Sequence, residues 1–112
     1  MDEQTYRRML PVFVLETRQR LDDMDHAILA LAREPGDTRA RSVLLTAAHT
    51  IKGNASAMGL KWMTLEAQRI ELWATLPSGG LTRGMLAGLN DARTALRAQL
   101  AEVAEGMMAE VA

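Results

Sequence analysis

One histidine in the chain stands among residues that suit nucleophilic chemistry. His49 lies in an alanine-rich stretch that favours a helix, and Lys52 and Gly53 follow it at spacings that make them neighbours on a helix surface. A neutral imidazole nitrogen can attack a phosphoryl group when the other nitrogen holds its proton on an acceptor. The positive charge of Lys52, one turn along the helix, would stabilise an anion carried by the ring. A helical glycine lowers stability by roughly 0.8–1.0 kcal/mol relative to alanine, so its purpose here would be room for a large reactant. The pattern indicates phosphoryl transfer at His49.

Such a histidine needs a carboxylate to hold its second nitrogen, and the segment after residue 60 offers two. These are Glu66 and Glu71, and the residues alone do not choose between them. A carboxylate would fix the tautomer and stabilise the positive charge that develops on the ring. We expect loss of the histidine to abolish the reaction and loss of the carboxylate only to slow it.

The other ionisable residues have simpler explanations. His26 lies off the apolar stripe of its segment and close to Asp22 and Asp25, which is typical of a solvated histidine. The Asp22-Asp23 pair could suggest the acidic pocket of a receiver domain, but such a pocket needs an α/β sheet. His26 and His49 do not have the spacing typical of a metal site. The absence of cysteine excludes disulfides, thiolate zinc sites, iron–sulfur clusters and cysteine nucleophiles.

Composition and charge narrow the remaining classes. A chain of 112 residues with 48% hydrophobic residues is expected to form one compact domain. A net charge of −1 gives no basic patch for nucleic acid. No apolar run approaches the roughly 18–20 residues that span a membrane, and the acidic start is unlike a signal peptide. We therefore expect a soluble, cytoplasmic and monomeric domain without nucleic-acid or membrane partners.

Glycine and proline divide the chain into four segments that must position these residues. The breaks fall at 35–36, 59 and 77–80, and apolar residues recur at three- and four-residue steps in each segment. Four amphipathic helices with short connections favour an all-α, antiparallel up-down four-helix bundle. The whole chain is then a single domain, with the bundle over about 10–104 and 105–112 as a frayed tail or the start of a linker.

Local signals place the ends of these helices. Asp37 and Thr82 are good N-caps for the second and fourth helices. Pro11 predicts that the main first helix starts there, because proline is tolerated in a first turn, and residues 2–9 would then be a short extra helical turn or a kinked extension. Trp62 and Trp73 are about three turns apart and share a face of the third helix. We expect core packing for both, with a partly exposed partner patch as the alternative.

The sequence around His49 resembles the histidine-containing phosphotransfer (HPt) domains, in particular the amino-terminal phosphotransfer domain of CheA-type chemotaxis kinases. The residues that carry the resemblance are Ala47-Ala48-His49-Thr50-Ile51-Lys52-Gly53 and Gly59-Leu60, with weaker similarity from about Phe13 to Val103. In that family the matching histidine is phosphorylated. The resemblance implies that Glu71 is the carboxylate that hydrogen-bonds it, and Gln68 stands as a site neighbour where many relatives have a second histidine.

The resemblance implies a phosphorelay carrier in two-component signalling. His49 would accept a phosphoryl group at Nε2 from an ATP-bound histidine kinase domain, with Nδ1–H held by Glu71, and pass it to an aspartate of a CheY-like response-regulator receiver domain. ATP and Mg²⁺ would belong to those partners, and no cofactor, metal or kinase activity is expected in this chain. The flank around the histidine would also dock the partners, through Leu45, Thr46, Ala48, Lys52, Gly53 and Ser56.

Alternatives to a phosphotransfer module of a CheA-like kinase remain open. One is a free-standing phosphotransfer protein of a hybrid-kinase relay. Another, from a different class, is an adaptor bundle that binds a receiver without being phosphorylated. The intact set of His49, Lys52 and Gly53 argues against the adaptor, because such a domain would be free to lose its histidine.

Overall fold

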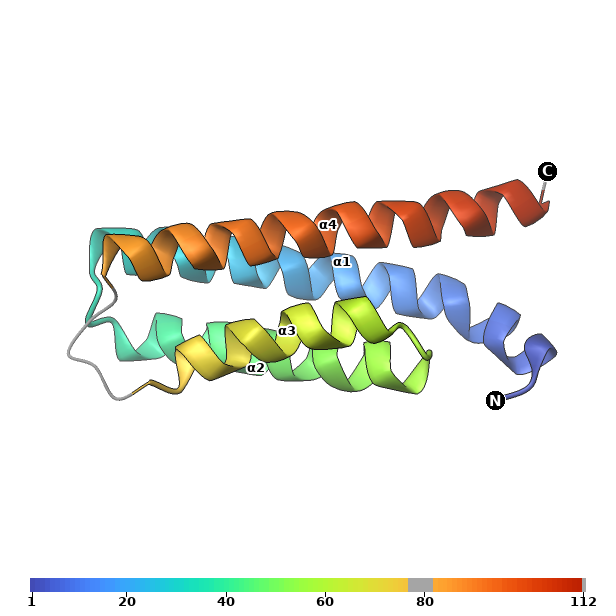
Figure 1. Cartoon of the computed structure of the whole chain (residues 1–112), viewed down its shortest axis with the longest axis horizontal. Helices are drawn as coiled ribbons and strands as arrows, with labels where there is room; N and C mark the ends of the chain where they lie inside the picture. Colours follow the sequence, from blue (N-terminus) through green and yellow to red (C-terminus); the bar gives the residue numbers. More distant parts are fainter. Residues whose placement is uncertain (77–81, 112) are drawn as a thin grey trace.

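Four α-helices make up the fold, which a computed structural model describes for residues 1–76 and 82–111. α1 spans Glu3–Arg33, α2 spans Thr38–Ala57, α3 spans Lys61–Ala74 and α4 spans Arg83–Val111, and these described residues contain no strand. α2 packs between α1 and α3, and α4 closes the ring by packing on both α3 and α1 (Figure 1). The predicted up-down four-helix bundle is confirmed. The predicted break at 77–80 lies outside the described residues.

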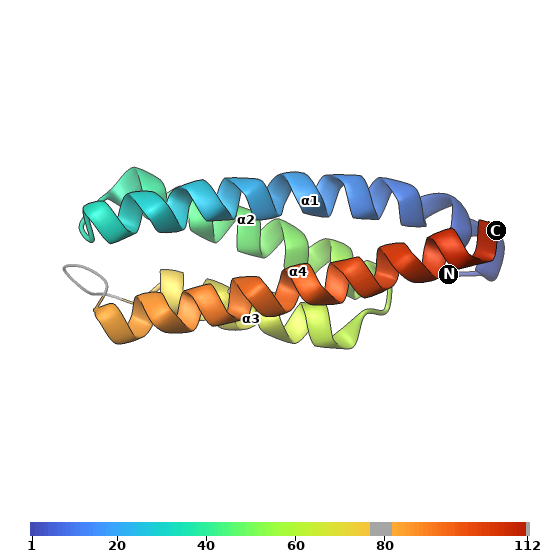
Figure 2. The same ribbon diagram turned by 90° about the horizontal axis from the view of Figure 1, so that it is seen from above.

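The helices differ in length, which makes the molecule elongated, with extents of 48 × 22 × 19 Å. α1 and α4 contain 31 and 29 residues, whereas α2 and α3 contain 20 and 14. The start of α1 and the end of α4 therefore continue past the turn between α2 and α3 (Figure 2). None of the helices in the described ranges is long and apolar enough to cross a membrane.

One apolar stripe from each helix builds the core and fixes the helices that carry the site. Fully burying a leucine or isoleucine contributes roughly 1.5–3 kcal/mol. The largest fully buried apolar side chains are Leu21, Met24, Leu31, Leu44, Ile51, Ile70, Leu89 and Leu96. Alanines fill the contacts between them in α2 and α3, which allows these two helices to approach closely.

α1 is one continuous helix, so the predicted start at Pro11 is wrong, and the residues before it extend the helix instead of forming a separate turn. The helix begins at Glu3 because Asp2 caps it, with Asp2 Oδ1 accepting a hydrogen bond from the Thr5 N–H at 2.8 Å. Pro11 lies inside the helix. Its missing N–H removes one helical hydrogen bond, but the buried side chains of Leu10, Phe13 and Val14 hold the segment on the core.

The last turns of the chain are also helical. α4 continues to Val111, so residues 105–111, which we expected to fray, belong to the helix, and residue 112 lies outside the described residues. An ion pair of 3.8 Å between Arg7 Nε and Glu110 Oε2 links this end of α4 to α1. The apolar stripe thins out here, which explains why periodicity did not predict the extension.

The predicted caps of α2 and α4 are confirmed. Asp37 Oδ1 accepts a hydrogen bond from the Ala40 N–H at 3.0 Å, and Thr82 Oγ1 accepts one from the Met85 N–H at 3.1 Å. Each side chain satisfies an N–H group that has no partner inside the helix.

A tight turn at Gly59 joins α2 to α3. Its φ of +71° lies in the left-handed region that favours glycine. The Leu60 N–H donates to the Ala55 carbonyl at 2.9 Å, and the Gly59 N–H donates to the Ser56 carbonyl at 3.0 Å, which is the Schellman motif. The turn sends α3 directly back along α2.

A cluster of ion pairs joins α1 to α4. Arg93 Nη1 lies 3.1 Å from Asp25 Oδ1, and Arg97 Nη2 lies 2.9 Å from Asp22 Oδ1 while also contacting Asp25. These contacts raise the pKa of Arg97 above its ordinary value, with the hydrogen bond to Asp22 as the largest cause. The aspartates beside His26 therefore pair with arginines across the bundle, and His26 itself is exposed.

Candidate functional site

His49, Glu71 and Lys52 meet on the surface between α2 and α3. His49 Nδ1 lies 3.3 Å from Glu71 Oε1, and Lys52 Nζ lies 2.8 Å from Glu71 Oε2. The two oxygens of one carboxylate thus contact two different partners. The His49 side chain is 70% exposed, against 21% for Glu71 and 29% for Lys52. An imidazole open to solvent is thus held by a partly buried carboxylate, which a partly buried ammonium group holds in turn.

Glu71 determines which nitrogen of His49 is available for reaction. An ionised carboxylate accepts hydrogen bonds but cannot donate them, so the contact requires a proton on Nδ1. In the neutral ring the lone pair then lies on Nε2, which is the nitrogen able to attack a phosphoryl group. At 3.3 Å this hydrogen bond is long.

Lys52 keeps that carboxylate ionised. The hydrogen bond from the Lys52 ammonium is the largest effect on the pKa of Glu71 and lowers it from its ordinary value. Partial burial acts in the opposite direction, and the hydrogen bond from His49 lowers the pKa further. Glu71 is therefore a permanent acceptor for the imidazole near neutral pH. The sequence did not predict this pairing, although the three-residue spacing of His49 and Lys52 places both on the flank that faces α3.

The surface beside His49 is open because Gly53 has no side chain. A Cβ built on Gly53 would meet no atom within 4 Å, so packing inside the molecule does not require a glycine there. Helical spacing places Leu45, Thr46 and Ser56 on the same flank of α2 as His49, and Thr46 and Ser56 are exposed while Leu45 is partly buried. Ala48 differs because it is fully buried in the core. The prediction that Ala48 contacts a partner is therefore wrong.

The two carboxylates that the sequence left open point to different neighbours. Glu66 and Glu71 are five residues apart, which separates them by about 140° around α3. Glu71 reaches His49, whereas the closest charged group to Glu66 is Arg69, whose Nη1 lies 4.0 Å from Glu66 Oε2. Gln68 is exposed on α3 and forms no hydrogen bond with the described residues. Among the described residues, the structure thus brings Glu71 to His49, whereas Glu66 and Gln68 form no hydrogen bond or ion pair with it.

The two tryptophans of α3 have unequal surroundings, so the prediction that both are core residues is wrong for Trp62. Trp73 is partly buried, and its ring lies so close to Gly88 of α4 that a Cβ on this glycine would overlap it. Trp62 is 74% exposed. The pattern within α3 could not distinguish them, because the difference lies in the residue that α4 presents to each ring.

Fold and site together define a phosphotransfer domain of the two-component type, and the family comparison agrees. The model of the Hpt domain family matches residues 8–106, so the chain belongs to that family and the predicted resemblance is confirmed.

A curated relative is the chemotaxis protein CheA of Halobacterium salinarum, which is 36% identical over 52 residues. This match covers 46% of the chain and 8% of the relative, so the chain corresponds to only a small part of that protein. No solved structure matches the chain.

Proposed function

We propose that His49 accepts a phosphoryl group from an ATP-bound histidine kinase domain and passes it to an aspartate of a response-regulator receiver domain. The observation that supports this most directly is the contact between Glu71 Oε1 and His49 Nδ1. It leaves an unprotonated Nε2 on a ring that is 70% exposed to an approaching protein.

Each half of the transfer exchanges one bond to phosphorus for another. Nε2 attacks the γ-phosphorus of ATP, the N–P bond forms, and the bond to the bridging oxygen breaks as ADP leaves. Glu71 stabilises the positive charge that develops on the ring, because Nδ1 keeps its proton throughout. In the second half an aspartate oxygen attacks the phosphorus, and the N–P electron pair returns to Nε2.

Positioning and electrostatics do the remaining work of such a transfer. Lys52 supplies a positive charge beside the site and also fixes Glu71. The open surface at Gly53, with Leu45, Thr46 and Ser56, allows a partner backbone to come close to the ring. ATP and Mg²⁺ belong to the partner domains in this proposal, and the chain contributes the histidine and its orientation.

The similarity to CheA favours a module of a chemotaxis kinase over a free-standing phosphotransfer protein. The two are distinguished by comparing the kinetics of phosphorylation by a CheA-type catalytic domain and by a hybrid kinase. A strong preference for the CheA-type domain is expected. A preference for the hybrid kinase would favour the free-standing carrier.

The test of the phosphoacceptor is a labelling experiment. Incubation with a histidine kinase catalytic domain and ATP labelled at the γ-phosphate should give label that is labile in acid and stable in base. His49→Gln should carry no label, whereas His26→Gln, which removes the only other histidine, should be labelled like the wild type. Label that persists in His49→Gln would contradict the proposal. A protein that binds a receiver but takes no label from either kinase would be an adaptor.

A further inference from the structure

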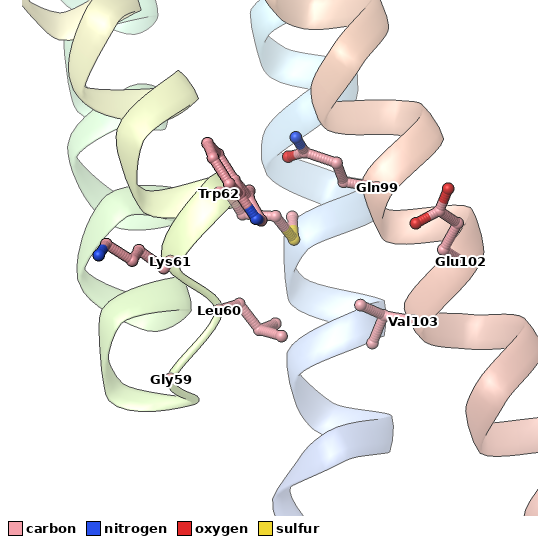
Figure 3. Close-up of a pocket in the computed structure, with 8 residues that line it drawn as sticks. Gly59, Leu60, Lys61, Trp62, Gln99, Glu102 and Val103 are labelled. Carbon is pink, nitrogen blue, oxygen red and sulfur yellow. The ribbon is translucent and has the colours of Figure 1, made fainter.

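A groove of about 370 Å³ lies between the start of α3 and residues 99–103 of α4. Figure 3 shows Leu60 and Val103 pointing toward one another across it, and Trp62 and Gln99 facing each other further along. Buried Met63 also lines the groove. The lining is thus apolar at its base and carries a tryptophan and an amide on its walls.

This groove is separate from the phosphorylation site. Trp62 and Glu71 are nine residues apart on α3, which is two and a half turns, so they lie on opposite flanks of that helix. Glu71 faces α2 and His49, whereas Trp62 lies on the flank of α4. A molecule in the groove would leave the imidazole free.

Trp62 is the most exposed of the large hydrophobic side chains in the described part of the chain. The other tryptophan of α3 is different, because Gly88 allows the Trp73 indole to lie against α4. At Trp62 the facing residue of α4 is Gln99, and the indole stays exposed at the wall of the groove. The face of an indole attracts a cation placed within about 6 Å of the ring centre.

Two carboxylates lie on the helices beside this indole. Glu102 lines the groove, and Glu66 lies one turn along α3 from Trp62. Gln99 Oε1 and Glu66 Oε2 are buried and form no hydrogen bond within the described residues, since the 4.0 Å contact from Arg69 to Glu66 is too long. Lys61, the single basic residue of the lining, points away from the groove in Figure 3.

We infer that the groove binds an arginine side chain carried on a segment of a protein partner. A guanidinium is flat enough to stack on Trp62 and positively charged to complement Glu102, and its N–H groups can donate to the Glu102 carboxylate and to the amide oxygen of Gln99. Apolar neighbours of that arginine would cover Leu60 and Val103. The inference does not depend on the phosphotransfer proposal, and it assigns Trp62 to partner binding while His49 remains accessible.

The test uses the unmodified domain, labelled with ¹⁵N, and a five-residue peptide with a central arginine between two leucines. The chain has two tryptophans, so their indole N–H signals report separately on the groove and on the core. We expect the Trp62 signal to shift in a saturable manner and the Trp73 signal to move little. A peptide with citrulline, which keeps the shape of arginine without its charge, should bind several-fold more weakly.

Variants assign the binding to the groove. Glu102→Gln should weaken the arginine peptide by about two- to fivefold, as removal of an exposed ion pair does, and Trp62→Ala should abolish measurable binding in a calorimetric titration. Glu105→Gln, three residues further along α4 and outside the groove, is the matched control and should bind like the wild type. Equal binding of the arginine and citrulline peptides, no response of Trp62, or shifts centred on His49 would each overturn the inference.

Discussion

His49 owes its chemistry to a carboxylate with two partners. Glu71 accepts from the imidazole through one oxygen and contacts the Lys52 ammonium through the other. The ammonium and the imidazole compete for the same negative charge. The shorter contact is the one to Lys52, and the ring is held by the longer one. This arrangement orients the imidazole through a carboxylate that is itself fixed by Lys52.

Removal of the carboxylate is expected to slow phosphorylation of His49 without abolishing it. Glu71→Ala frees the ring to rotate and to place its proton on either nitrogen, and a misplacement of this kind reduces a rate by about 10²-fold. The measurement is the initial rate of labelling by a kinase catalytic domain. Glu66→Ala, which removes the other carboxylate of the same helix, should leave the rate unchanged, and equal rates for both variants would exclude the orienting role of Glu71.

Acid should destabilise the domain through Glu71. The pKa of this group is lowered from an ordinary value of 4.5, mainly by the hydrogen bond from Lys52. Its contribution to the free energy of unfolding is therefore complete above about pH 4.5 and is lost as the pH falls through the lower value of the folded state. Urea midpoints from neutral pH into acid should fall more steeply for the wild type than for Glu71→Gln. Parallel curves would contradict the ion pair, and Glu105→Gln should follow the wild type.

At the scale of the helices, two glycines have opposite roles that substitution separates. Gly88→Ala places a Cβ where the Trp73 ring lies, and the forced shift should destabilise the fold by about 1–3 kcal/mol. Gly53→Ala meets no neighbour and should stabilise the helix by up to about 1 kcal/mol. Urea denaturation measures both. An equal gain in stability for Gly88→Ala and Gly53→Ala would mean that the indole does not lie against Gly88.

Much of the helical architecture and the central residue of the site followed from the sequence, because both depend on spacing along one chain. The caps Asp37 and Thr82 are local signals of this kind. Predictions failed where the decisive partner lies on another helix. Pro11 is typical of a first helical turn, but packing against the core extends α1 on the N-terminal side of this proline. Trp62 and Trp73 share a face of α3 and differ in the residue that α4 places opposite each ring. Spacing also could not choose Glu71 over Glu66, since that choice depends on which flank of α3 meets α2.

For the whole molecule, the ion-pair cluster between α1 and α4 has a testable energetic role. Asp25 pairs with both Arg93 and Arg97, so Asp25→Asn should lower the free energy of unfolding by about 1 kcal/mol, with a smaller difference at high salt. Asp23→Asn is the matched control, because Asp23 pairs with Arg20 of its own helix at 3.1 Å. Equal effects of the two substitutions would show that the cluster adds nothing to the packing of α1 on α4.

The turn at Gly59 fixes how α3 is rotated relative to α2, and therefore where Glu71 points. His49 and Glu71 lie in two helices joined by this single turn, and each residue added to a helix rotates everything after it by about 100°. One residue inserted between the turn and Glu71 would therefore carry the carboxylate away from α2 and also move the apolar stripe of α3 off the core. The distance along the chain from histidine to carboxylate is thus fixed by helical phase, so we expect functional variants of this domain to change length elsewhere and to keep that interval constant.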